Sequence, residues 1–491
     1  MPKNAIVIGA GIAGIASAIR LNSQGFSVTV YESNVHPGGK LHQKKLNGFR
    51  FDMGPSLFTM PWLVDELFQL CNKNPKDYFR YFRKETICNY FWEDGTQFSA
   101  ASDQETFCSD ASNTFNEPKE NIAAYLKKNE TKYRLTKSVF LEKSLHKLRT
   151  YLSNDTLKAF LRISGMGINQ TLDSVNASSF SNPKLIQFFN RFATYNGSSP
   201  YQTPGIMSMI PHLEMDLGTY FPEGGMFQIT ESLYKLAKEV GVSFHFNSPV
   251  TEILVSDKKA IGVRVGDINI NAEVVVSNMD VYHTYTKLLI DQIPPKKTLA
   301  QERSSSALIF YWGIKKQFPE LDLHNIFFSE NYQQEFDHIF NKKSLCDDPT
   351  IYVNISSKEE EKDAPKGHEN WFVMINAPGN YSQDWEELKL QARKNILSKL
   401  SRNLNCAVQE LIVDEMVWDP VGIENQTSSY RGALYGAASN SRFAAFLRHP
   451  NFSKRIKNLY FCGGSVHPGG GIPLCLLSGK IVGDLVKTNS G

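Results

Sequence analysis

The sequence predicts an α/β protein of two or three domains, and its first thirty residues carry the main evidence. Residues 5–32 follow the order apolar strand, glycine turn, helix and second strand, closed by the acid Glu32. The turn has the spacing Gly-x-Gly-x-x-Gly at Gly9, Gly11 and Gly14. With 491 residues and 41% apolar content, the chain is long enough to bury large cores.

The glycine turn has the features of a Rossmann-type dinucleotide site. Gly9 permits the tight turn, Gly11 lets the backbone approach a pyrophosphate, and Gly14 lets the helix pack closely on the strand. The helix N-terminus then faces the phosphates. Glu32 can accept hydrogen bonds from an adenosine ribose. The predicted site also includes the neighbouring residues Ala13 and Ser33.

Several other classes of protein are disfavoured. The N-terminal stretch is not an export signal, because Arg20 interrupts it and no cleavage site follows, and no uninterrupted run of about 20 apolar residues occurs. The seven cysteines form no Cys-x-x-Cys pair, which predicts reduced structural thiols and no metal site. A net charge of +3 argues against a dedicated nucleic-acid binder. We expect a cytoplasmic protein.

Basic charge is concentrated in residues 121–162, which carry ten Lys or Arg against three acids. Apolar side chains are interleaved there at helical spacing. Such a segment is typical either of helices that lie on an anionic membrane surface or of a solvated, salt-bridged helical face. The sequence leaves both open, and the first predicts a peripherally membrane-associated protein.

Two further loops combine glycines with rigid turns. In the first, the glycine pair at 38–39 lets the backbone wrap a bulky ligand, and a Gly-Pro turn follows at 54–55. The second follows a buried strand pattern at 458–462 and leads into an apolar helix from Leu474 to about Val486. The predicted cofactor residues in these loops are Gly38, Gly39, Lys40, Gly54, Pro55, Ser56, Gly463, Gly464, Gly471 and Ile472.

These loops resemble those of the flavin-dependent family that includes amine oxidases, protoporphyrinogen oxidase and carotenoid desaturases. The resemblance covers nearly the whole chain and implies FAD as the cofactor. In that family a Pro-x-Gly-Gly turn, matched here by residues 220–224, borders the flavin, and the residue matched by Val250 contacts the adenine through its backbone. The C-terminal glycine loop leads into a helix N-terminus, which suits the negative charge of a reduced flavin ring.

The resemblance implies an amine oxidase-like flavoprotein fold with a mixed-sheet substrate domain and a helical membrane-facing subdomain. The expected FAD-binding domain is discontinuous and comprises residues 1–75, 220–290 and 440–491. The substrate domain comprises residues 76–219 and 291–439, including the basic segment. Smaller expected elements are a helix at 227–240, a strand at 242–246, a meander at 248–277, strands at 306–314 and 371–377, and a charged exposed loop at 357–367.

Within this family the chain is similar to bacterial phytoene desaturase-type enzymes, and it looks most like the 1-hydroxycarotenoid 3,4-desaturases. The features are Lys40 after the paired glycines, residues 58–60 after the Gly-Pro turn, and residues 464–467. The implied reaction is hydride transfer from a carotenoid to the flavin, with oxygen or a quinone as the final acceptor. The protein then needs mainly to orient the substrate and exclude water.

No catalytic base stands out. Glu214 and Asp216, just before the Gly-Gly turn, and His467 in the C-terminal loop are candidates. The alternatives are a solvated or capping role for the two acids and a loop-shaping role for the histidine. Three other functions stay open: a phytoene or diapophytoene desaturase, an amine oxidase-like flavoenzyme, and a non-enzymatic lipid-carrying chaperone of the same fold.

Overall fold

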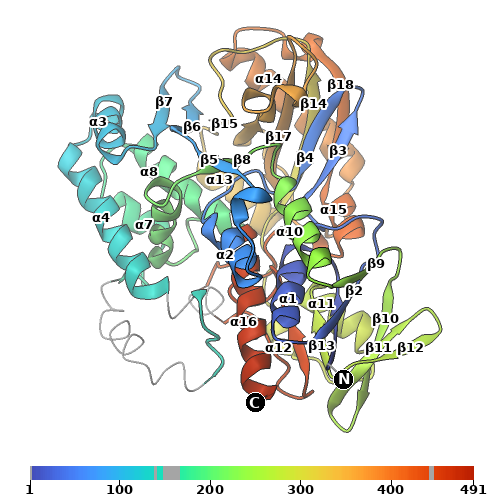
Figure 1. Ribbon diagram of the computed structural model, residues 1–491. Coiled ribbons are helices and arrows are strands. Elements are labelled where there is room, and N and C mark those ends of the chain that lie inside the picture. The colour runs from blue at the N-terminus through green and yellow to red at the C-terminus, as the bar shows by residue number, and fades with distance from the viewer. Residues whose placement is uncertain (1–2, 138–140, 148–165, 442–446, 491) are drawn as a thin grey trace.

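Two β-sheets divide the molecule into two layers in the computed structural model, which describes residues 3–137, 141–147, 166–441 and 447–490 (Figure 1). The lower layer in that view holds a five-stranded sheet, and the upper layer holds a seven-stranded sheet. Both chain ends lie at the bottom of the lower layer.

The lower sheet is entirely parallel and has the order β19-β13-β1-β2-β9. Its central strands are buried on both faces, which explains their continuous apolar sequence. The strands come from all three stretches assigned to the cofactor domain. They are β1 (Asn4–Ile8), β2 (Ser27–Tyr31), β9 (Ser243–His245), β13 (Val274–Ser277) and β19 (Leu459–Phe461).

Four helices form one core with this sheet: α1 (Ile12–Ser23), α2 (Trp62–Leu70), α10 (Gln228–Glu239) and α16 (Ile472–Ser490). The first and last helices of the chain pack side by side. Gly479 allows this close approach, because a Cβ there would lie 3.1 Å from the Ala16 Cβ and 3.2 Å from the Ala13 carbonyl oxygen. The two ends of the sequence therefore complete a single layer.

The opposite face of the lower sheet packs against a small antiparallel sheet. Its strands are β10 (Val250–Ser256), β11 (Lys259–Val265) and β12 (Ile268–Asn271). The predicted meander therefore ends at Asn271, since β13 leaves it and joins β1 in the parallel sheet. Short helices α11 (Val281–His283) and α12 (Lys296–Leu299) follow β13.

The upper sheet is mixed and has the order β18-β14-β17-β16-β15-β6-β7. All neighbours are antiparallel except β15 and β6. Its strands are β6 (Thr86–Phe91), β7 (Gln97–Ala101), β14 (Ser306–Ile314), β15 (His324–Phe327), β16 (Ile351–Asn354), β17 (Glu369–Ala377) and β18 (Ile412–Trp418). The expected strands at 306–314 and 371–377 are thus present, the second beginning two residues earlier.

Helix α14 (Trp385–Asn403) packs against the upper sheet in one core. A second, aromatic core joins β6 and β7 to a group of helices on the left of Figure 1. These helices are α3 (Gln104–Phe115), α4 (Lys119–Thr136), α7 (Leu172–Ala177), α8 (Pro183–Asn190), α9 (Ile210–Met215) and α13 (Tyr332–Asp337).

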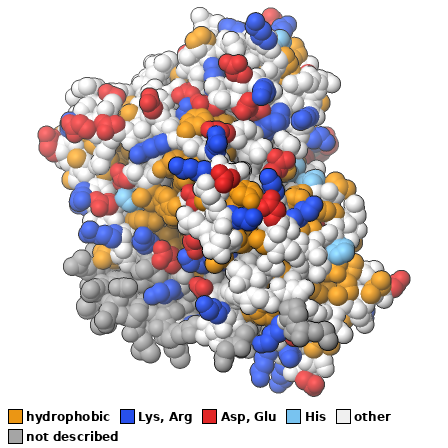
Figure 2. Space-filling view, in the orientation of Figure 1, with side chains coloured by type: hydrophobic (Ala, Val, Ile, Leu, Met, Phe, Trp, Pro, Cys, Tyr) orange, Lys and Arg blue, Asp and Glu red, His pale blue; other side chains and the backbone are white. Residues whose placement is uncertain are grey.

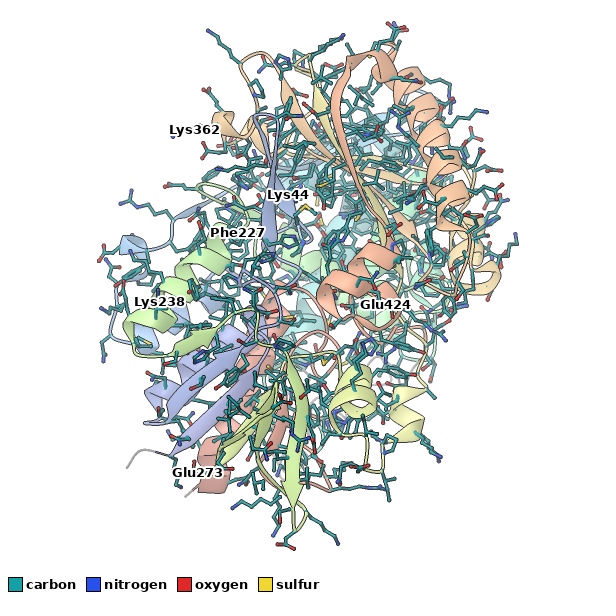
Figure 3. All side chains as sticks on the ribbon, turned by 90° about the vertical axis from the view of Figure 1, so that its right-hand side faces the viewer. Lys44, Phe227, Lys238, Glu273, Lys362 and Glu424 are labelled. Atoms are coloured by element: carbon teal, nitrogen blue, oxygen red, sulfur yellow. The ribbon has the colours of Figure 1, made fainter. Side chains whose placement is uncertain are left out.

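Hairpins tie the two layers together. The antiparallel pair β3 (His42–Leu46) and β4 (Phe49–Met53) directs Phe49 and Phe51 into a core with Tyr311 of β14. The Asp52 carboxylate accepts hydrogen bonds from the N–H groups of Met226 (2.8 Å) and Phe227 (2.9 Å), at the start of α10. Phe227 is labelled in Figure 3, between the two layers. A second pair, β5 (Tyr81–Arg83) with β8 (Tyr220–Pro222), lies nearby.

The expected exposed loop at 357–367 is wrong in part. Asp363 is 1% exposed, because its carboxylate accepts a hydrogen bond of 2.7 Å from Arg50 Nε and another from the Ser356 hydroxyl. Desolvation raises the pKa of Asp363 to about 6, although the Arg50 charge opposes this. One of the charged residues of this loop, Asp363, therefore forms a buried ion pair with Arg50 of β4.

Only part of the basic segment is described. Residues up to Thr136 belong to α4, residues 141–147 form no α-helix, and residues 148–162 lie outside the described ranges. Lys127, Lys128 and Arg134 are exposed, whereas Lys132 turns inward and donates a hydrogen bond of 2.7 Å to Ser208 Oγ. On the face shown in Figure 2, basic and acidic side chains are interspersed.

Candidate functional site

The site lies where four adjacent parallel strands end. Gly9 follows β1, Glu32 follows β2, Asn278 follows β13, and Gly463 comes two residues after β19. Ligands of open α/β sheets bind at this carboxyl edge, beside the point where the strand order reverses. Here β1 has β2 on one side and β13 on the other. The fold therefore brings residues that are up to 454 positions apart to one edge.

The glycines form a cradle that admits no side chains. A Cβ at Gly14 would lie 2.1 Å from the Gly9 carbonyl oxygen, and one at Gly38 would lie 2.1 Å from the Leu41 carbonyl oxygen. Gly11 and Gly38 are joined by an isolated parallel bridge, which places the first two glycine loops in contact. Helix α1 begins here with Gly11 as its N-cap and no side-chain cap, so its first N–H groups are left for a ligand.

Asn278 was missed by the sequence analysis. Its side-chain amide lies against three glycines of the cradle. A Cβ added to Gly11 would lie 2.6 Å from the Asn278 Oδ1, and one added to Gly14 would lie 3.0 Å from the same oxygen. A Cβ added to Gly463 would lie 2.6 Å from the Asn278 Nδ2. Its Nδ2 also donates to the Cys462 carbonyl (3.2 Å). The sequence carries no local signal for Asn278, because Ser277 already ends the apolar run 274–276.

Glu32 is buried and is held by its neighbours. Its Oε2 accepts a hydrogen bond from the Ala10 N–H (2.6 Å), and its Oε1 accepts from the Asn34 N–H (2.9 Å) and the Ser33 hydroxyl (3.2 Å). The Glu32 backbone carbonyl accepts from the Ser248 N–H (2.9 Å). Val250, at the start of β10, comes two residues after Ser248 and so lies on the Glu32 side of the site, where the adenosine is predicted.

Lys40 joins the second glycine loop to residues 433–434. Its buried Nζ donates hydrogen bonds of 3.0 Å to the carbonyls of Ala433 and Leu434. Desolvation lowers the pKa of Lys40, and the negative charge of Asp280 opposes this. Gly54 sits against this loop, because a Cβ there would lie 2.1 Å from the Lys40 carbonyl oxygen. The Gly54–Ser56 turn and Lys40 thus form one wall.

The C-terminal loop ends at the N-terminus of α16. Gly471 precedes the helix, Ile472 is buried at its start, and the first turn carries no acidic residue. Gly463 has φ +107°, and its N–H donates to Ser478 Oγ (3.1 Å). Gly464 packs closely on Gly470 in the same loop, because a Cβ added to Gly464 would lie 3.2 Å from the Gly470 Cα.

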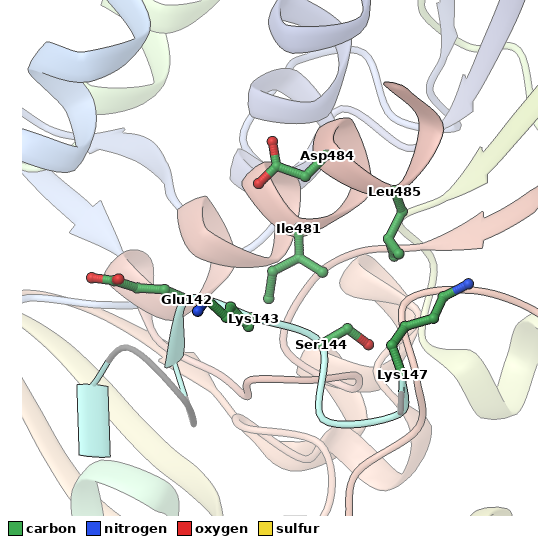
Figure 4. A pocket seen from close by; sticks show the side chains of 7 residues that line it. All are labelled: Glu142, Lys143, Ser144, Lys147, Ile481, Asp484 and Leu485. Atoms are coloured by element: carbon green, nitrogen blue, oxygen red, sulfur yellow. The ribbon is translucent and has the colours of Figure 1, made fainter. Parts of the chain in front are cut away.

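His467 is engaged in packing. It is 2% exposed, and its Nε2 donates to the Lys143 carbonyl (2.9 Å). Burial lowers the pKa of His467 to about 3, so the ring is neutral at physiological pH. This contact brings the 142–147 loop against α16, and the two enclose a pocket of about 310 Å³ lined by Ile481 and Leu485 on the helix side (Figure 4). These contacts support a loop-shaping role for His467.

Glu214 is neither a solvated nor a capping residue. It is 2% exposed, and its Oε1 accepts a hydrogen bond of 2.7 Å from Arg191 Nη2. Desolvation raises the pKa of Glu214, whereas the Arg191 charge lowers it. Asp216 comes at the C-terminal end of α9, half-buried, and its carboxylate accepts a hydrogen bond from His212 Nδ1. Both acids therefore already have partners.

The geometry fits FAD. A diphosphate requires close backbone approach and free N–H groups, and the cradle of Gly9, Gly11, Gly14 and Gly38 with the uncapped α1 provides both. Glu32 lies at the end of β2 for the ribose, and the N-terminus of α16 is available to the flavin ring. Within the described ranges, no group of three His, Cys, Asp or Glu side chains is placed to hold a metal ion.

Nearly the whole chain matches one known protein family. The family model described as "Flavin containing amine oxidoreductase" matches residues 12–486 of this chain. The chain belongs to this family, it is an oxidoreductase, and its cofactor is FAD.

Two curated relatives match over nearly their whole lengths. The 1-hydroxycarotenoid 3,4-desaturase of Flavobacterium sp. (strain P99-3) is 61% identical over 488 residues, covering 99% of this chain and 100% of the relative. The 4,4'-diaponeurosporene oxygenase of Staphylococcus aureus (strain MSSA476) is 34% identical over 495 residues, covering 99% and 98%.

Solved structures show the same fold at low identity. Cyclohexylamine oxidase from Brevibacterium oxydans IH-35A aligns with a TM-score of 0.62 at 14% identity, covering 100% of both chains. An oxidoreductase from Methanosarcina mazei aligns with a TM-score of 0.63 at 16% identity, covering 99% of this chain and 100% of that one. These structures confirm the amine oxidase-like flavoprotein architecture.

Proposed function

We propose that this protein is an FAD-dependent carotenoid desaturase that introduces the 3,4 double bond into 1-hydroxycarotenoids. The observation that carries the proposal is the 61% identity, over 99% of this chain, to a 1-hydroxycarotenoid 3,4-desaturase. The complete glycine cradle supports a working cofactor site rather than a lipid-carrying chaperone that has lost it.

FAD, when bound, accepts a hydride from the carbon next to the polyene, and loss of a proton from the neighbouring carbon completes the double bond. The chain's own contribution is to bind, orient and exclude water. The aromatic core around β6 and α8 supplies an apolar environment for a polyene, with Phe188, Phe189 and Phe192 fully buried. Glu214 and His467 are both committed to internal contacts, so neither is assigned as a base.

Two alternatives are separated by substrate chemistry. An amine oxidase would act on a polar amine, and the amine oxidases among the solved structures share only 13–14% identity, which supports the fold alone. The relative at 34% identity is a diaponeurosporene oxygenase, so oxygen insertion into an acyclic carotenoid is the second candidate reaction.

The test is a product assay with the purified flavoprotein and membranes. We expect a 1-hydroxycarotenoid to lose two hydrogens and its absorption to shift to the red, and phytoene to react little. Mass analysis separates this product from one that has gained oxygen. Efficient conversion of phytoene, with no action on the hydroxylated compound, would overturn the proposed substrate. Parallel assays with oxygen alone and with a quinone under anaerobic conditions identify the final acceptor.

We also propose that the protein attaches peripherally to an anionic membrane surface through its basic segment. None of the helices in the described ranges is long and apolar enough to span a bilayer. Each basic residue near an anionic surface contributes about 1 kcal/mol of attraction. The 142–147 loop contacts both α16 and His467, which supports a route for a lipid-dissolved substrate beside the cofactor layer.

Liposome flotation tests the attachment. The variant changes Lys127, Lys128 and Arg134 to Glu and spares the inward-turned Lys132. We expect it to lose binding to anionic vesicles. A control with the same charge change replaces the exposed Lys44 and Lys45 of β3 and the exposed Lys366, whose neighbour Pro365 lies against Gly48 in the β3–β4 turn, and should still bind. If both variants bind anionic vesicles equally well, the basic segment does not mediate the attachment.

A further inference from the structure

A group of polar side chains lies inside the aromatic core of the substrate layer. The Arg191 guanidinium packs over the rings of Phe192 (4.3 Å from its centroid) and Tyr90 (5.3 Å), and it pairs with Glu214. Tyr90 is 0% exposed and Arg191 is 7% exposed. Such groups are costly to bury unless each donor and acceptor has a partner.

Three of the buried polar atoms here have no hydrogen-bond partner among the described residues: Arg191 Nε, the Tyr90 hydroxyl oxygen and His324 Nε2. The Cys88 thiol is the hydrogen-bonding group beside the Tyr90 hydroxyl, and a thiol is a weak partner. His324 lies on the neighbouring strand, where Ile326 pairs with Tyr90, so His324, two residues earlier, is on the same face of the sheet as Tyr90. Several unpaired groups in one buried region call for an occupant.

The hydrogen-bond pattern fixes the tautomer of His324. Asn354 Nδ2 donates both to the Leu323 carbonyl (3.0 Å) and to His324 Nδ1 (3.2 Å). Since Nδ1 accepts, the neutral ring carries its proton on Nε2. The Tyr352 hydroxyl lies 2.7 Å from the same Nδ1 and is a second donor that shares its single lone pair with the Asn354 amide. The unpaired Nε2–H is therefore a donor, as is Arg191 Nε–H.

The charge of the group selects a neutral ligand. Arg191 and Glu214 neutralise each other at 2.7 Å, and burial lowers the pKa of His324 to about 3, so its ring is uncharged. A cationic amine would meet the two unpaired N–H donors with repulsion, and a carboxylate would have no net positive charge to balance it. A hydroxyl group fits, because its oxygen accepts from N–H donors and its proton is donated to a hydroxyl such as that of Tyr90.

A chain of hydrogen bonds links this group to the cofactor wall. Ser56 Oγ lies 2.8 Å from the Tyr352 hydroxyl, which donates to His324. Ser56 belongs to the Gly54–Ser56 turn that packs on Lys40. A ligand hydroxyl at His324 Nε2 would lie across the imidazole ring from this chain, which connects the ring to the Gly54–Ser56 turn through Tyr352.

Resting on the proposed function, we propose that Tyr90, Arg191 and His324 form the subsite that recognises the tertiary hydroxyl of the carotenoid. Glu214 is then a positioning residue that holds the Arg191 guanidinium. Such a site rejects substrates that lack the hydroxyl, because its own polar groups would remain unpaired.

The test variant is Tyr90→Phe, which removes one hydroxyl and keeps the ring. Because that hydroxyl has no hydrogen-bond partner stronger than the Cys88 thiol, the variant should fold with little loss of stability. We expect KM for the 1-hydroxycarotenoid to rise about tenfold, from the loss of one hydrogen bond, with kcat little changed. The KM for the same carotenoid without the hydroxyl should stay constant, so discrimination falls by the same factor.

Tyr125→Phe is the matched control in the same core. The Tyr125 hydroxyl donates to Asn176 Oδ1 at 2.6 Å, so this variant should lose stability but keep the wild-type discrimination. Unchanged KM values in Tyr90→Phe would overturn the subsite and leave water as its occupant. A wild-type protein that ignores the hydroxylated substrate would instead overturn the proposed function itself.

Discussion

The cofactor site in the lower layer (the cofactor layer) and the proposed substrate site in the aromatic core joined to the upper sheet (the substrate layer) are built from different parts of the chain. The cofactor layer uses backbone: glycines whose missing side chains leave room for a ligand, and the free N-termini of α1 and α16. The proposed substrate site uses side chains: buried rings around the Arg191–Glu214 pair. A Cβ added to Gly11, Gly14 or Gly38 would collide with neighbouring atoms, so substitutions there disrupt the cofactor site as a whole. In a site built from side chains, each substitution changes one interacting group.

Gly11→Val attacks the backbone site and has the largest expected effect. A Cβ at this position lies 2.6 Å from Asn278 Oδ1, and a branched side chain would fill the space for the pyrophosphate. We expect the purified variant to retain no flavin, measured as flavin absorbance per protein. Gly266→Asn is the control, since its φ is +56° and nothing lies within 4 Å of the added Cβ. Full flavin occupancy in Gly11→Val would refute the cradle.

Glu214→Gln tests the side-chain site. Removing one partner of a buried ion pair leaves Arg191 uncompensated and lowers the free energy of unfolding by about 3–5 kcal/mol. Chemical denaturation measures this loss. The double variant Arg191→Met with Glu214→Leu should recover much of the stability, because apolar side chains replace both charges.

Glu105→Gln serves as the reference for that experiment. Its ion pair with Lys119 is largely exposed, so the change should cost at most about 1 kcal/mol. If Glu214 were instead the catalytic base, Glu214→Gln would lower kcat and leave the stability unchanged. That outcome would contradict the positioning role.

His467→Gln has the smallest expected effect and concerns pH. The His467 pKa is about 3 in the folded protein against 6.5 ordinarily. Between these values the unfolded chain binds a proton that the folded protein does not, so the free energy of unfolding rises with pH. The variant should reduce this slope by about 1.4 kcal/mol per pH unit within the window. Its amide can still donate to the Lys143 carbonyl.

Unfolding curves at several pH values between 4 and 6.5 provide the measurement. His449 is a suitable comparison, because burial also lowers its pKa to about 4 and it should behave in the same direction. An unchanged slope in His467→Gln would show that the ring is protonated in the folded protein and available for proton transfer.

Local chemistry made the cofactor layer predictable. Gly9, Gly11 and Gly14 lie within six residues, and their spacing has meaning without the rest of the fold. The strand at 306–314 was equally clear from its continuous apolar pattern. In contrast, Asn278 gave no local signal, since its contacts with the glycines depend on β13 pairing with β1.

The charged residues show the same limit. Asp363 was placed in an exposed loop because its neighbours are charged, but Arg50 from β4 pairs with it inside the protein. Glu214 was a candidate base with a solvated or capping role as the alternative, and Arg191, 23 residues away, holds it in the aromatic core. Composition around a residue does not reveal which distant side chain will meet it.

By itself the sequence determined the α/β class and the dinucleotide turn, because strand and helix periodicity and glycine conformation act over a few residues. The resemblance of its glycine loops to those of a flavin-dependent family implied FAD. The tertiary structure alone decided which polar groups meet in the substrate layer. Ser56, Tyr352 and His324 come from separate parts of the chain and form one hydrogen-bonded series only after both layers have packed. Burial then removes water and leaves each of their polar atoms dependent on a protein or ligand partner.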